Sequence, residues 1–251
     1  MAEVVSYRRE GRIALITVDN PPVNALSLPV RAGLAKAFTQ FAADGDAAAA
    51  VLICAGRTFI AGADITEFDK PIEEPWLPKV IHQIEDSKKP VVAAIHGYCL
   101  GAGLELAMLA DIRIAATDAI FALAQVTLGT QIVGGADLRM VSELGAARVK
   151  WLAMTGRRFG PAEAEQWGLV QQVVAPDELL STAMALAHEI AGNAPLAVQG
   201  VKRAVNHVAY RGFDEASSFE ALASSVLWSS DDVYKGFAAK ARKEQADFDG
   251  K

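Results

Sequence analysis

The stretch His96-Gly97-Tyr98-Cys99-Leu100-Gly101-Ala102-Gly103-Leu104-Glu105 follows an apolar run that predicts a β-strand. Glycines at 101 and 103 allow the backbone to approach a ligand closely, because no side chain stands in the way. A helix that begins near Ala102 leaves the Ala102 N–H without an intrahelical acceptor, at the positive end of the helix. Glu105 comes three residues later and shares the helix face above that donor. The stretch therefore predicts a strand–turn–helix with a carboxylate beside an N–H that is suited to developing negative charge.

Another glycine-containing turn lies at residues 59–64 (FIAGAD), after the apolar run 50–54. It comes first along the chain, so it is the first glycine turn, and the turn within residues 96–105 is the second. Two such turns can aim two backbone N–H groups at one carbonyl oxygen, which is the minimal machinery for stabilising an enolate or a tetrahedral oxyanion. Asp64 has a second interpretation, because an aspartate after such a turn commonly caps the next helical turn, here residues 65–67. Glu105 has one too, as a helix-capping carboxylate or an ion-pair partner of Arg113.

Length and composition favour a globular enzyme. The chain has 251 residues, of which 52% are hydrophobic, so it can bury a large core. Its net charge of −6, with no dominant basic stripe, argues against a nucleic-acid partner. Residues 91–110 contain three glycines and Glu105, which argues against a membrane span. No signal-peptide pattern begins the chain, and Cys54 and Cys99 lie in apolar runs typical of buried free thiols, so we expect a cytoplasmic protein.

Short strands alternate with helices up to about residue 175, which predicts an α/β core. The opening residues 4–9 and 13–19 predict a β-hairpin, and Ser27 predicts the N-cap of a helix over 28–43. The proline-containing segment 69–78 predicts a loop with Trp76 and Leu77 exposed. Beyond it we expect a helix at 79–86, a strand at 90–96 and helices at 178–192, 196–210, 214–227 and 231–245. The change of pattern divides the chain into an α/β core, 1–194, and a helical region, 195–251.

Other catalytic patterns match poorly. A dinucleotide fingerprint would need a third glycine at position 106, where leucine stands. The four histidines (82, 96, 188 and 207) show no metal-ligand spacing, so no metal is expected. A nucleophile elbow for Ser-His-Asp catalysis is not found in the sequence either.

The chain resembles the enoyl-CoA hydratase/isomerase superfamily, also called the crotonase family, over nearly its whole length. The resemblance is carried by residues 20–26 (NPPVNAL), 59–65 (FIAGADI), 90–105, 111–115 (DIRIA), 155–156, 164–170 (AEQWGLV) and 248–251 (FDGK). It implies a spiral of ββα units followed by a helical trimerisation region, assembled as a homotrimer or hexamer. It also implies a small-molecule acyl-CoA as substrate, without a permanently bound cofactor.

The resemblance assigns roles to particular residues. The backbone N–H groups of Ala63 and Ala102 would hold the thioester oxygen. Glu105 would be the catalytic acid/base. Residues implied to border the adenine are Ala61, Asp64 and Ile65, with Pro22 and Val23 nearby, while the 69–78 loop with Trp76 and Leu77 would border the acyl tail.

Two departures from the family pattern affect the expected chemistry. Hydratases of this family usually use a second glutamate about twenty residues after the first, and Gln125 stands there. Glutamine can orient water but cannot transfer a proton at neutral pH. Val133, which we count with the substrate-binding residues, stands near the position where some relatives place a catalytic aspartate. Asp137 is close in sequence, but the frame favours it as the start of the next helix.

The expected reaction is hydration of a 2-enoyl-CoA through an enolate, with Glu105 as acid/base and Gln125 positioning the water. One alternative is a double-bond isomerase, in which a single carboxylate moves a proton between C2 and C4. Another is a catalytically weak acyl-CoA-binding homologue. A thioester hydrolase or decarboxylase with the same oxyanion pocket also stays open, because fold alone does not determine chemistry.

Overall fold

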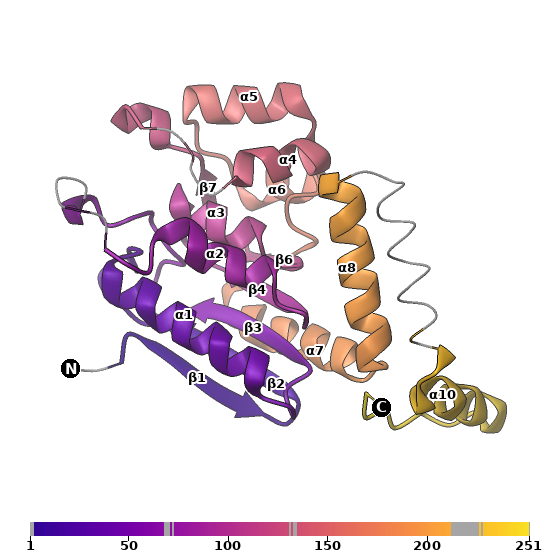
Figure 1. Ribbon diagram of the computed structural model, residues 1–251. Coiled ribbons are helices and arrows are strands. Elements are labelled where there is room, and N and C mark those ends of the chain that lie inside the picture. The colour runs from indigo at the N-terminus through magenta and orange to yellow at the C-terminus, as the bar shows by residue number, and fades with distance from the viewer. Residues whose placement is uncertain are drawn as a thin grey trace.

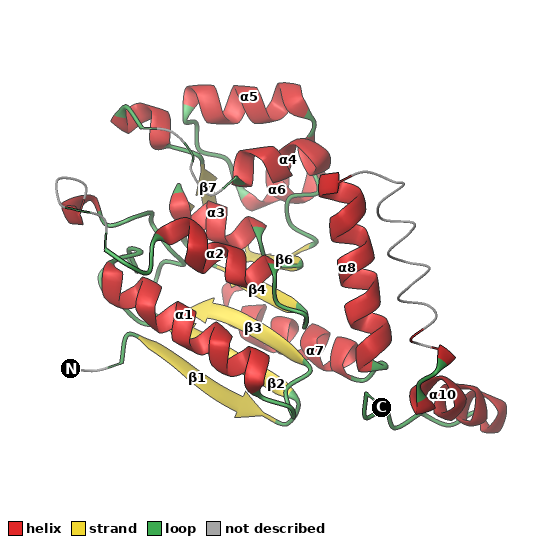
Figure 2. Cartoon of the chain, in the orientation of Figure 1, coloured by secondary structure: helices red, strands yellow, loops and turns green. Residues whose placement is uncertain are grey.

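The computed structural model describes residues 3–67, 71, 73–130, 132, 135–211, 226 and 228–250. Within them, no helix is both long and apolar enough to cross a membrane. Helices surround a central sheet and a smaller second sheet (Figure 2). The predicted α/β class is therefore confirmed, while the cytoplasmic location stays a prediction.

The central sheet has six strands in the order β1-β2-β3-β4-β6-β8. The predicted opening hairpin is confirmed, since β1 (Val5–Glu10) and β2 (Ile13–Val18) pair antiparallel. All later pairs are parallel. The other strands are β3 (Ala49–Cys54), β4 (Val91–Ile95), β6 (Ile112–Ala116) and β8 (Gln172–Val174). The central strands are almost continuously apolar because helices cover both faces of a parallel sheet.

Helix α7 (Leu179–Ala191) covers one face of the sheet. Its buried residues recur at every fourth position, Leu179, Ala183, Ala187 and Ala191, and the small alanines let the helix lie close to β3 and β4. Helices α1 (Leu28–Ala43) and α2 (Leu77–Glu85) cover the opposite face (Figure 1). The predicted helix over 28–43 is confirmed.

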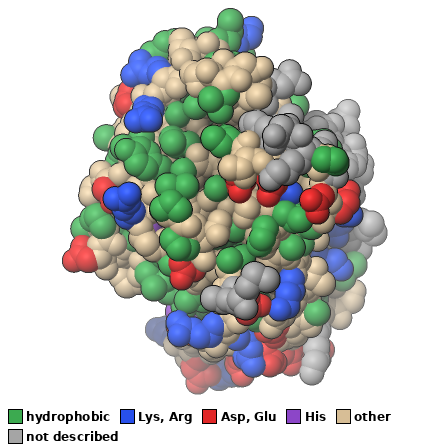
Figure 3. All heavy atoms as spheres, turned by 90° about the vertical axis from the view of Figure 1, so that its left-hand side faces the viewer, with side chains coloured by type: hydrophobic (Ala, Val, Ile, Leu, Met, Phe, Trp, Pro, Cys, Tyr) green, Lys and Arg blue, Asp and Glu red, His purple; other side chains and the backbone are tan. Residues whose placement is uncertain are grey.

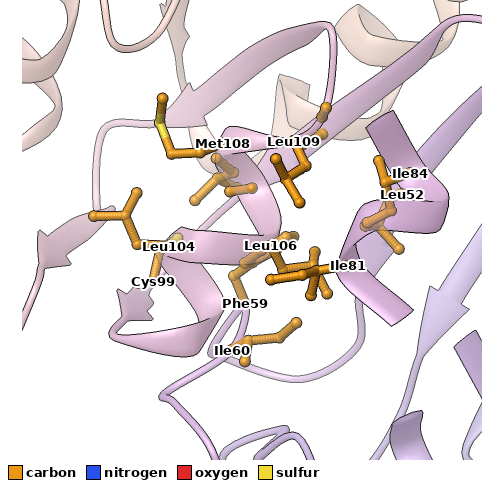
Figure 4. Packing of buried hydrophobic residues seen from close by; sticks show 14 of the residues in the cluster. Leu52, Phe59, Ile60, Ile81, Ile84, Cys99, Leu104, Leu106, Met108 and Leu109 are labelled. Carbon is orange, nitrogen blue, oxygen red and sulfur yellow. The ribbon is translucent and has the colours of Figure 1, made fainter. Parts of the chain in front are cut away.

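Strand β5 (Tyr98–Leu100) precedes the short helix α3 (Ala102–Met108), and strand β7 (Ile120–Ala122) follows it. The two strands pair as a small parallel sheet. Every residue of α3 is buried. Leu104 and Leu106 lie in one cluster with Phe59 and Ile60 of the first glycine turn and with α2 (Figure 4). This packing ties the second glycine turn to the first.

The remaining elements surround this core. They are η1 (Ile65–Glu67), η2 (Gln125–Leu128), α4 (Ala136–Leu144), α5 (Ala146–Thr155), α6 (Pro161–Gln166), η3 (Pro176–Glu178), α8 (Pro195–Arg211) and α10 (Asp231–Arg242). Three of the four predicted C-terminal helices are thus confirmed. The fourth, predicted at 214–227, lies outside the described residues except for residue 226. In Figure 1, α10 lies beside the C-terminus, away from α3.

A buried ion pair attaches α8 to the core. Lys202 Nζ lies 2.9 Å from Asp111 Oδ2, and the same carboxylate oxygen accepts the Val91 N–H at 2.7 Å. Burial raises the pKa of Asp111, although Lys202 opposes that change. The first helix of the region 195–251 is therefore packed against the α/β core, and the division at residue 194 stays a prediction.

Two local predictions need correction. The loop predicted over 69–78 ends earlier, because α2 begins at Leu77. Leu77 is buried rather than exposed, and Pro78 fits this first turn, where its missing N–H would have no intrahelical acceptor. Trp76 is exposed, as predicted. Ser27 occupies the N-cap position of α1, but its side chain makes no capping hydrogen bond.

Candidate active site

The two glycine turns lie side by side. Phe59 N–H donates to the His96 carbonyl oxygen at 2.9 Å, and Ile60 N–H donates to the Tyr98 oxygen at 3.0 Å. The Leu100 N–H returns a hydrogen bond to the Ile60 oxygen at 3.0 Å. Residues far apart in sequence therefore run parallel up to the two turns, as β-strands do.

Glycine at position 103 is required by this close approach. A Cβ there would lie 2.2 Å from the Ile60 carbonyl oxygen, well inside van der Waals contact. Gly101 has a different requirement, because its φ of 51° lies in the left-handed region that favours glycine. The turn from β5 into α3 thus depends on both glycines.

Two backbone N–H groups at these turns are available as donors. Ala102 is the first residue of α3, so its N–H has no acceptor within the helix. Ala63 pairs with Leu26 through an isolated bridge, in which the Leu26 N–H donates to the Gly62 oxygen at 2.9 Å. Among the described residues, neither the Ala63 nor the Ala102 N–H donates a hydrogen bond.

Glu105 and Gln125 meet beside the second turn. Gln125 Nε2 donates to Glu105 Oε1 at 2.7 Å, and Glu105 is only 2% exposed. The Gln125 Oε1 atom is buried and accepts no hydrogen bond from the part of the chain that is described. A buried polar atom without a partner is uncommon in folded proteins and commonly marks a place for water or a ligand.

Arg113 does not provide the alternative partner for Glu105. Its guanidinium donates to the Leu169 oxygen at 2.5 Å and to Glu143 Oε2 at 2.8 Å, and it also contacts the Ala110 oxygen. The interpretation of Glu105 as an ion-pair partner of Arg113 is therefore wrong. The arginine links β6 to α4, while the Glu105 carboxylate faces Gln125.

The residues that the sequence assigns to adenine binding gather near the first turn. Ala61 N–H donates to the Val23 oxygen at 3.1 Å, and Pro22 is exposed beside them. Asp64 caps η1, since its Oδ1 accepts the Thr66 N–H at 3.0 Å. Ile65 follows and is 66% exposed. The capping interpretation of Asp64 is confirmed, and one oxygen of its carboxylate therefore already accepts a hydrogen bond within the chain.

Other candidates lie further along the chain. Trp76 stands at the N-cap of α2 and is 44% exposed. Val133 falls outside the described residues. Asp137 lies in the first turn of α4, as its frame predicts. The face that carries residues 65–67 and 125–128 shows hydrophobic side chains interspersed with charged ones (Figure 3). Such a face can accept a ligand with an apolar part.

Sequence reasoning missed two buried residues that support the first turn. Asn24 has a φ of 51° and its Nδ2 donates to the Ala55 and Thr58 oxygens at 2.9 and 2.7 Å. Arg31 is buried in the first turn of α1. A polar side chain within an apolar stretch was the available signal for each, but their partners are distant in sequence.

The remaining reactive groups are structural. Cys54 and Cys99 are buried free thiols, as predicted, and burial raises the pKa of both. Such thiols are poor nucleophiles. In the described part of the chain, no group of three or more His, Cys, Asp or Glu side chains is arranged to hold a metal ion.

Known proteins are similar to this chain in both sequence and architecture. The family model described as enoyl-CoA hydratase/isomerase matches residues 8–251. A short-chain-enoyl-CoA hydratase from Clostridium acetobutylicum is 34% identical, over 96% of this chain and 95% of that protein. A carnitinyl-CoA dehydratase from Salmonella arizonae is 34% identical over the whole of both chains. The crystal structure of an enoyl-CoA hydratase from Bacillus anthracis is 30% identical and superposes with a TM-score of 0.94, covering 99% of this chain and 100% of that one.

The family match extends over nearly the whole sequence, and the spatial likeness covers both sheets and the C-terminal helices. Members of the matching family act on acyl-CoA substrates. The chain is therefore an enzyme of the enoyl-CoA hydratase/isomerase (crotonase) superfamily, with the α/β crotonase fold.

Proposed function

We propose that this protein is an enoyl-CoA hydratase, adding water across the C2–C3 double bond of a 2-enoyl-CoA or removing it in the reverse direction. The observation that carries the proposal is the 2.7 Å hydrogen bond between Gln125 Nε2 and Glu105 Oε1, next to the two glycine turns. It brings the acid/base candidate Glu105 together with an amide that can hold water. Relatives named as a hydratase and as a dehydratase support the same reaction class.

The two turns supply the electrostatic part of the mechanism. Attack of water at C3 moves negative charge onto the thioester oxygen, producing an enolate. The N–H groups of Ala63 and Ala102 would donate to that oxygen from preorganised positions. Removing one such donor typically costs about 3 kcal/mol of transition-state stabilisation, so two donors account for a large part of the catalysis.

Glu105 would carry the proton in both halves of the reaction. Its carboxylate takes a proton from the attacking water, whose oxygen forms the bond to C3. The same carboxyl group then returns a proton to C2 as the enolate collapses, so the carboxylate is regenerated. Burial at 2% exposure keeps bulk water from competing for this proton.

Gln125 would orient the water rather than activate it. With Nε2 committed to Glu105, the buried Oε1 is left to accept an O–H from a water molecule between the two side chains. The amide neither takes nor gives a proton at neutral pH, so hydration would rest on one carboxylate. We expect slower hydration than in a two-glutamate site, because a missing proton-transfer partner costs about 10² to 10⁴ in rate.

Substrate recognition would follow the edges of the site. We propose that Pro22, Val23, Ala61, Asp64 and Ile65 border the adenine of CoA. Trp76, at the start of α2, would border the acyl tail, and Val133 would be among the residues that bind the substrate. The exposed apolar surface of Ile65 and Trp76 supports this placement.

The C-terminal helices would join copies of the chain into a homotrimer or hexamer. Several large apolar side chains on α8 and α10 are exposed: Val201, Val205, Val208, Tyr234 and Phe237. Exposed apolar surface of this kind commonly marks an interface. Sedimentation equilibrium would test this, and a monomer at micromolar concentration would contradict it.

A double-bond isomerase is the second candidate, favoured by the glutamine at position 125. Moving a proton between C2 and C4 requires one carboxylate and no bound water. Such an enzyme would convert a 3-enoyl-CoA but leave a 2-enoyl-CoA without hydration. A catalytically weak acyl-CoA-binding homologue would bind both and convert neither.

Steady-state turnover of crotonyl-CoA separates these functions, using the unaltered protein, Glu105→Gln and Gln125→Glu. We expect slow hydration by the unaltered protein and a loss of about 10² to 10⁴ in Glu105→Gln. Gln125→Glu should increase the rate by about tenfold or more, because it restores a second proton-transfer group. Gln166→Glu is the matched control, since Gln166 is exposed on α6 and gains the same charge.

Two results would contradict hydration, and a third would contradict the role of Glu105. One is conversion of 3-pentenoyl-CoA to the 2-enoyl isomer without any addition of water, which indicates the isomerase. Another is binding of crotonyl-CoA by calorimetry without turnover in all three proteins, which indicates the binding homologue. The third is undiminished hydration in Glu105→Gln, which would remove Glu105 from the mechanism.

A further inference from the structure

A buried arginine, Arg31, joins three separate segments of the chain. Its Nη1 donates to the Leu26 carbonyl oxygen at 2.9 Å and to Glu67 Oε2 at 2.6 Å. Its Nε donates to the Pro75 carbonyl oxygen at 2.9 Å. The residue is 7% exposed, so these acceptors replace water around the guanidinium. Because the guanidinium is planar and rigid, it fixes the segments relative to one another.

Both oxygens of the Glu67 carboxylate are engaged. While Oε2 binds Arg31, Oε1 accepts the Leu28 N–H at 2.7 Å. Leu28 is the first residue of α1, whose N-cap residue makes no side-chain capping bond. Glu67 therefore caps α1 from a position almost forty residues later, and the negative charge suits the helix N-terminus.

These contacts hold the chain on both sides of Ala63 in the first glycine turn. Leu26 N–H donates to the Gly62 oxygen at 2.9 Å, immediately before Ala63. Glu67 ends η1, which begins two residues after Ala63. The segment that carries the Ala63 N–H is thus held before the alanine by Leu26 and after it by the Arg31–Glu67 pair.

The same arginine reaches the segment proposed to border the acyl tail. Pro75, whose oxygen accepts the Arg31 Nε–H, directly precedes Trp76 at the start of α2. One side chain therefore contacts both Glu67, which follows the first glycine turn, and Pro75, which precedes the segment proposed to border the acyl tail. A shift of either segment would be transmitted through this guanidinium.

We propose that Arg31 and Glu67 are positioning residues, which hold the Ala63 N–H at the thioester oxygen and set its position relative to the Pro75–Trp76 segment. This inference rests on the proposed oxyanion role of Ala63. Neither side chain touches the substrate in this account. Their effect reaches the reaction through the backbone of residues 62–67.

A second buried arginine–glutamate pair provides a matched control. Arg113 Nη2 lies 2.8 Å from Glu143 Oε2, with side-chain exposures of 4% and 29%, against 9% and 27% for Arg31 and Glu67. The contacts of Arg113 are with Ala110, Leu169, Gln171 and Glu143, so they lie outside both glycine turns. The two pairs are alike in burial and chemistry, but they contact different segments of the chain.

The kinetic test compares Glu67→Gln with Glu143→Gln, adding Arg31→Lys to retain the charge without the planar fork. We expect kcat for crotonyl-CoA to fall about 10- to 100-fold in Glu67→Gln and Arg31→Lys, because a donor displaced by a fraction of an ångström loses transition-state stabilisation. KM should change by less than about threefold, since the lost interaction strengthens only in the transition state. Glu143→Gln should retain kcat within about twofold, while thermal melting shows comparable losses of stability in both Glu→Gln variants.

An infrared measurement gives a readout that a purely structural pair would not change. Butyryl-CoA, labelled with ¹³C at the thioester carbonyl, binds without reacting because it has no double bond. Hydrogen bonds from Ala63 and Ala102 should lower its carbonyl stretching frequency in the unaltered protein. In Glu67→Gln part of that shift should be lost, whereas in Glu143→Gln it should be retained.

The outcomes distinguish this inference from the function on which it rests. If bound butyryl-CoA shows no carbonyl shift in the unaltered protein, the proposed oxyanion site itself fails. If the shift is present and Glu67→Gln preserves both the shift and kcat, the oxyanion site stands and the positioning role is overturned. Equal loss of kcat in Glu67→Gln and Glu143→Gln would also overturn it, because a general loss of stability would then explain both.

Discussion

The two glycine turns differ in how they are held. The second turn, residues 100–105, runs directly into α3, and its neighbours in the sheet and helix fix its backbone. In the part of the chain that the structure describes, the first turn, residues 59–64, leads into the three-residue η1 and not into an α-helix. It is supported instead by Asn24, Leu26 and the Arg31–Glu67 pair, all contacts across more than thirty residues of sequence.

The two proposed donors therefore depend on different kinds of interaction. The Ala102 N–H is oriented by local helix geometry and by the close contact of Gly103 with Ile60. The Ala63 N–H is oriented by tertiary hydrogen bonds between polar groups that are mostly buried. Damage to the second turn should therefore disturb the core, whereas damage to the first should lower activity at a smaller cost in stability.

The largest expected effect is that of Gly103→Ala, which should disrupt the contact between the two turns. The new Cβ would lie 2.2 Å from the Ile60 carbonyl oxygen, which belongs to the backbone. We expect a loss of more than about 3 kcal/mol in the free energy of unfolding, because a clash with backbone cannot be relieved by a change of rotamer. Urea denaturation at equilibrium measures this loss.

Gly45→Ala is the matched control for that substitution. A Cβ at Gly45 meets nothing within 4 Å, and the residue is exposed. Its stability should stay the same or rise by about 0.4–1 kcal/mol, because alanine lowers the entropy of the unfolded chain. If Gly103→Ala were as stable as Gly45→Ala, the two turns would not depend on the close contact of Gly103 with Ile60.

The next effect in size is that of Asn24→Ala, which should loosen the first turn. The substitution leaves the Ala55 and Thr58 oxygens without their shared donor and places alanine at a φ of 51°. We expect a loss of about 3 kcal/mol in unfolding free energy, from unsatisfied buried carbonyls and backbone strain together. Asn24→Gly should recover about 1 kcal/mol of it, since glycine accepts the left-handed conformation.

Asn193→Ala provides the comparison for the hydrogen bonds of Asn24. Asn193 is exposed, and its Nδ2 donates to the Glu189 oxygen at 3.0 Å. Its removal should cost less than about 0.5 kcal/mol, because water replaces the lost donor. Equal losses at positions 24 and 193 would mean that the first turn does not depend on its tertiary hydrogen bonds.

Local patterns predict the α/β class, the opening hairpin and several helices, but they do not predict the order of the strands in the sheet. Helix 28–43 and the start of α3 at Ala102 were predicted because proline and glycine positions and apolar spacing act over a few residues. The meeting of Glu105 with Gln125 was expected only from family resemblance. The contacts of Arg31 with Glu67 and Pro75 were not predicted, since they join residues 36 and 44 apart through side chains whose partners no local pattern identifies.

The smallest expected effect is that of Ser27→Ala, which tests which group caps α1. Serine at an N-cap usually contributes about 1 kcal/mol, but the Ser27 side chain makes no capping bond and the Leu28 N–H binds Glu67 Oε1 at 2.7 Å. We therefore expect Ser27→Ala to change the unfolding free energy by less than about 0.5 kcal/mol and to leave kcat unaltered. Glu67→Gln measured in the same urea titration should lose more, because its carboxylate serves both the helix end and Arg31. If Ser27→Ala were the more damaging of the two, α1 would be capped locally and the first turn would not depend on Glu67 for its connection to the helix.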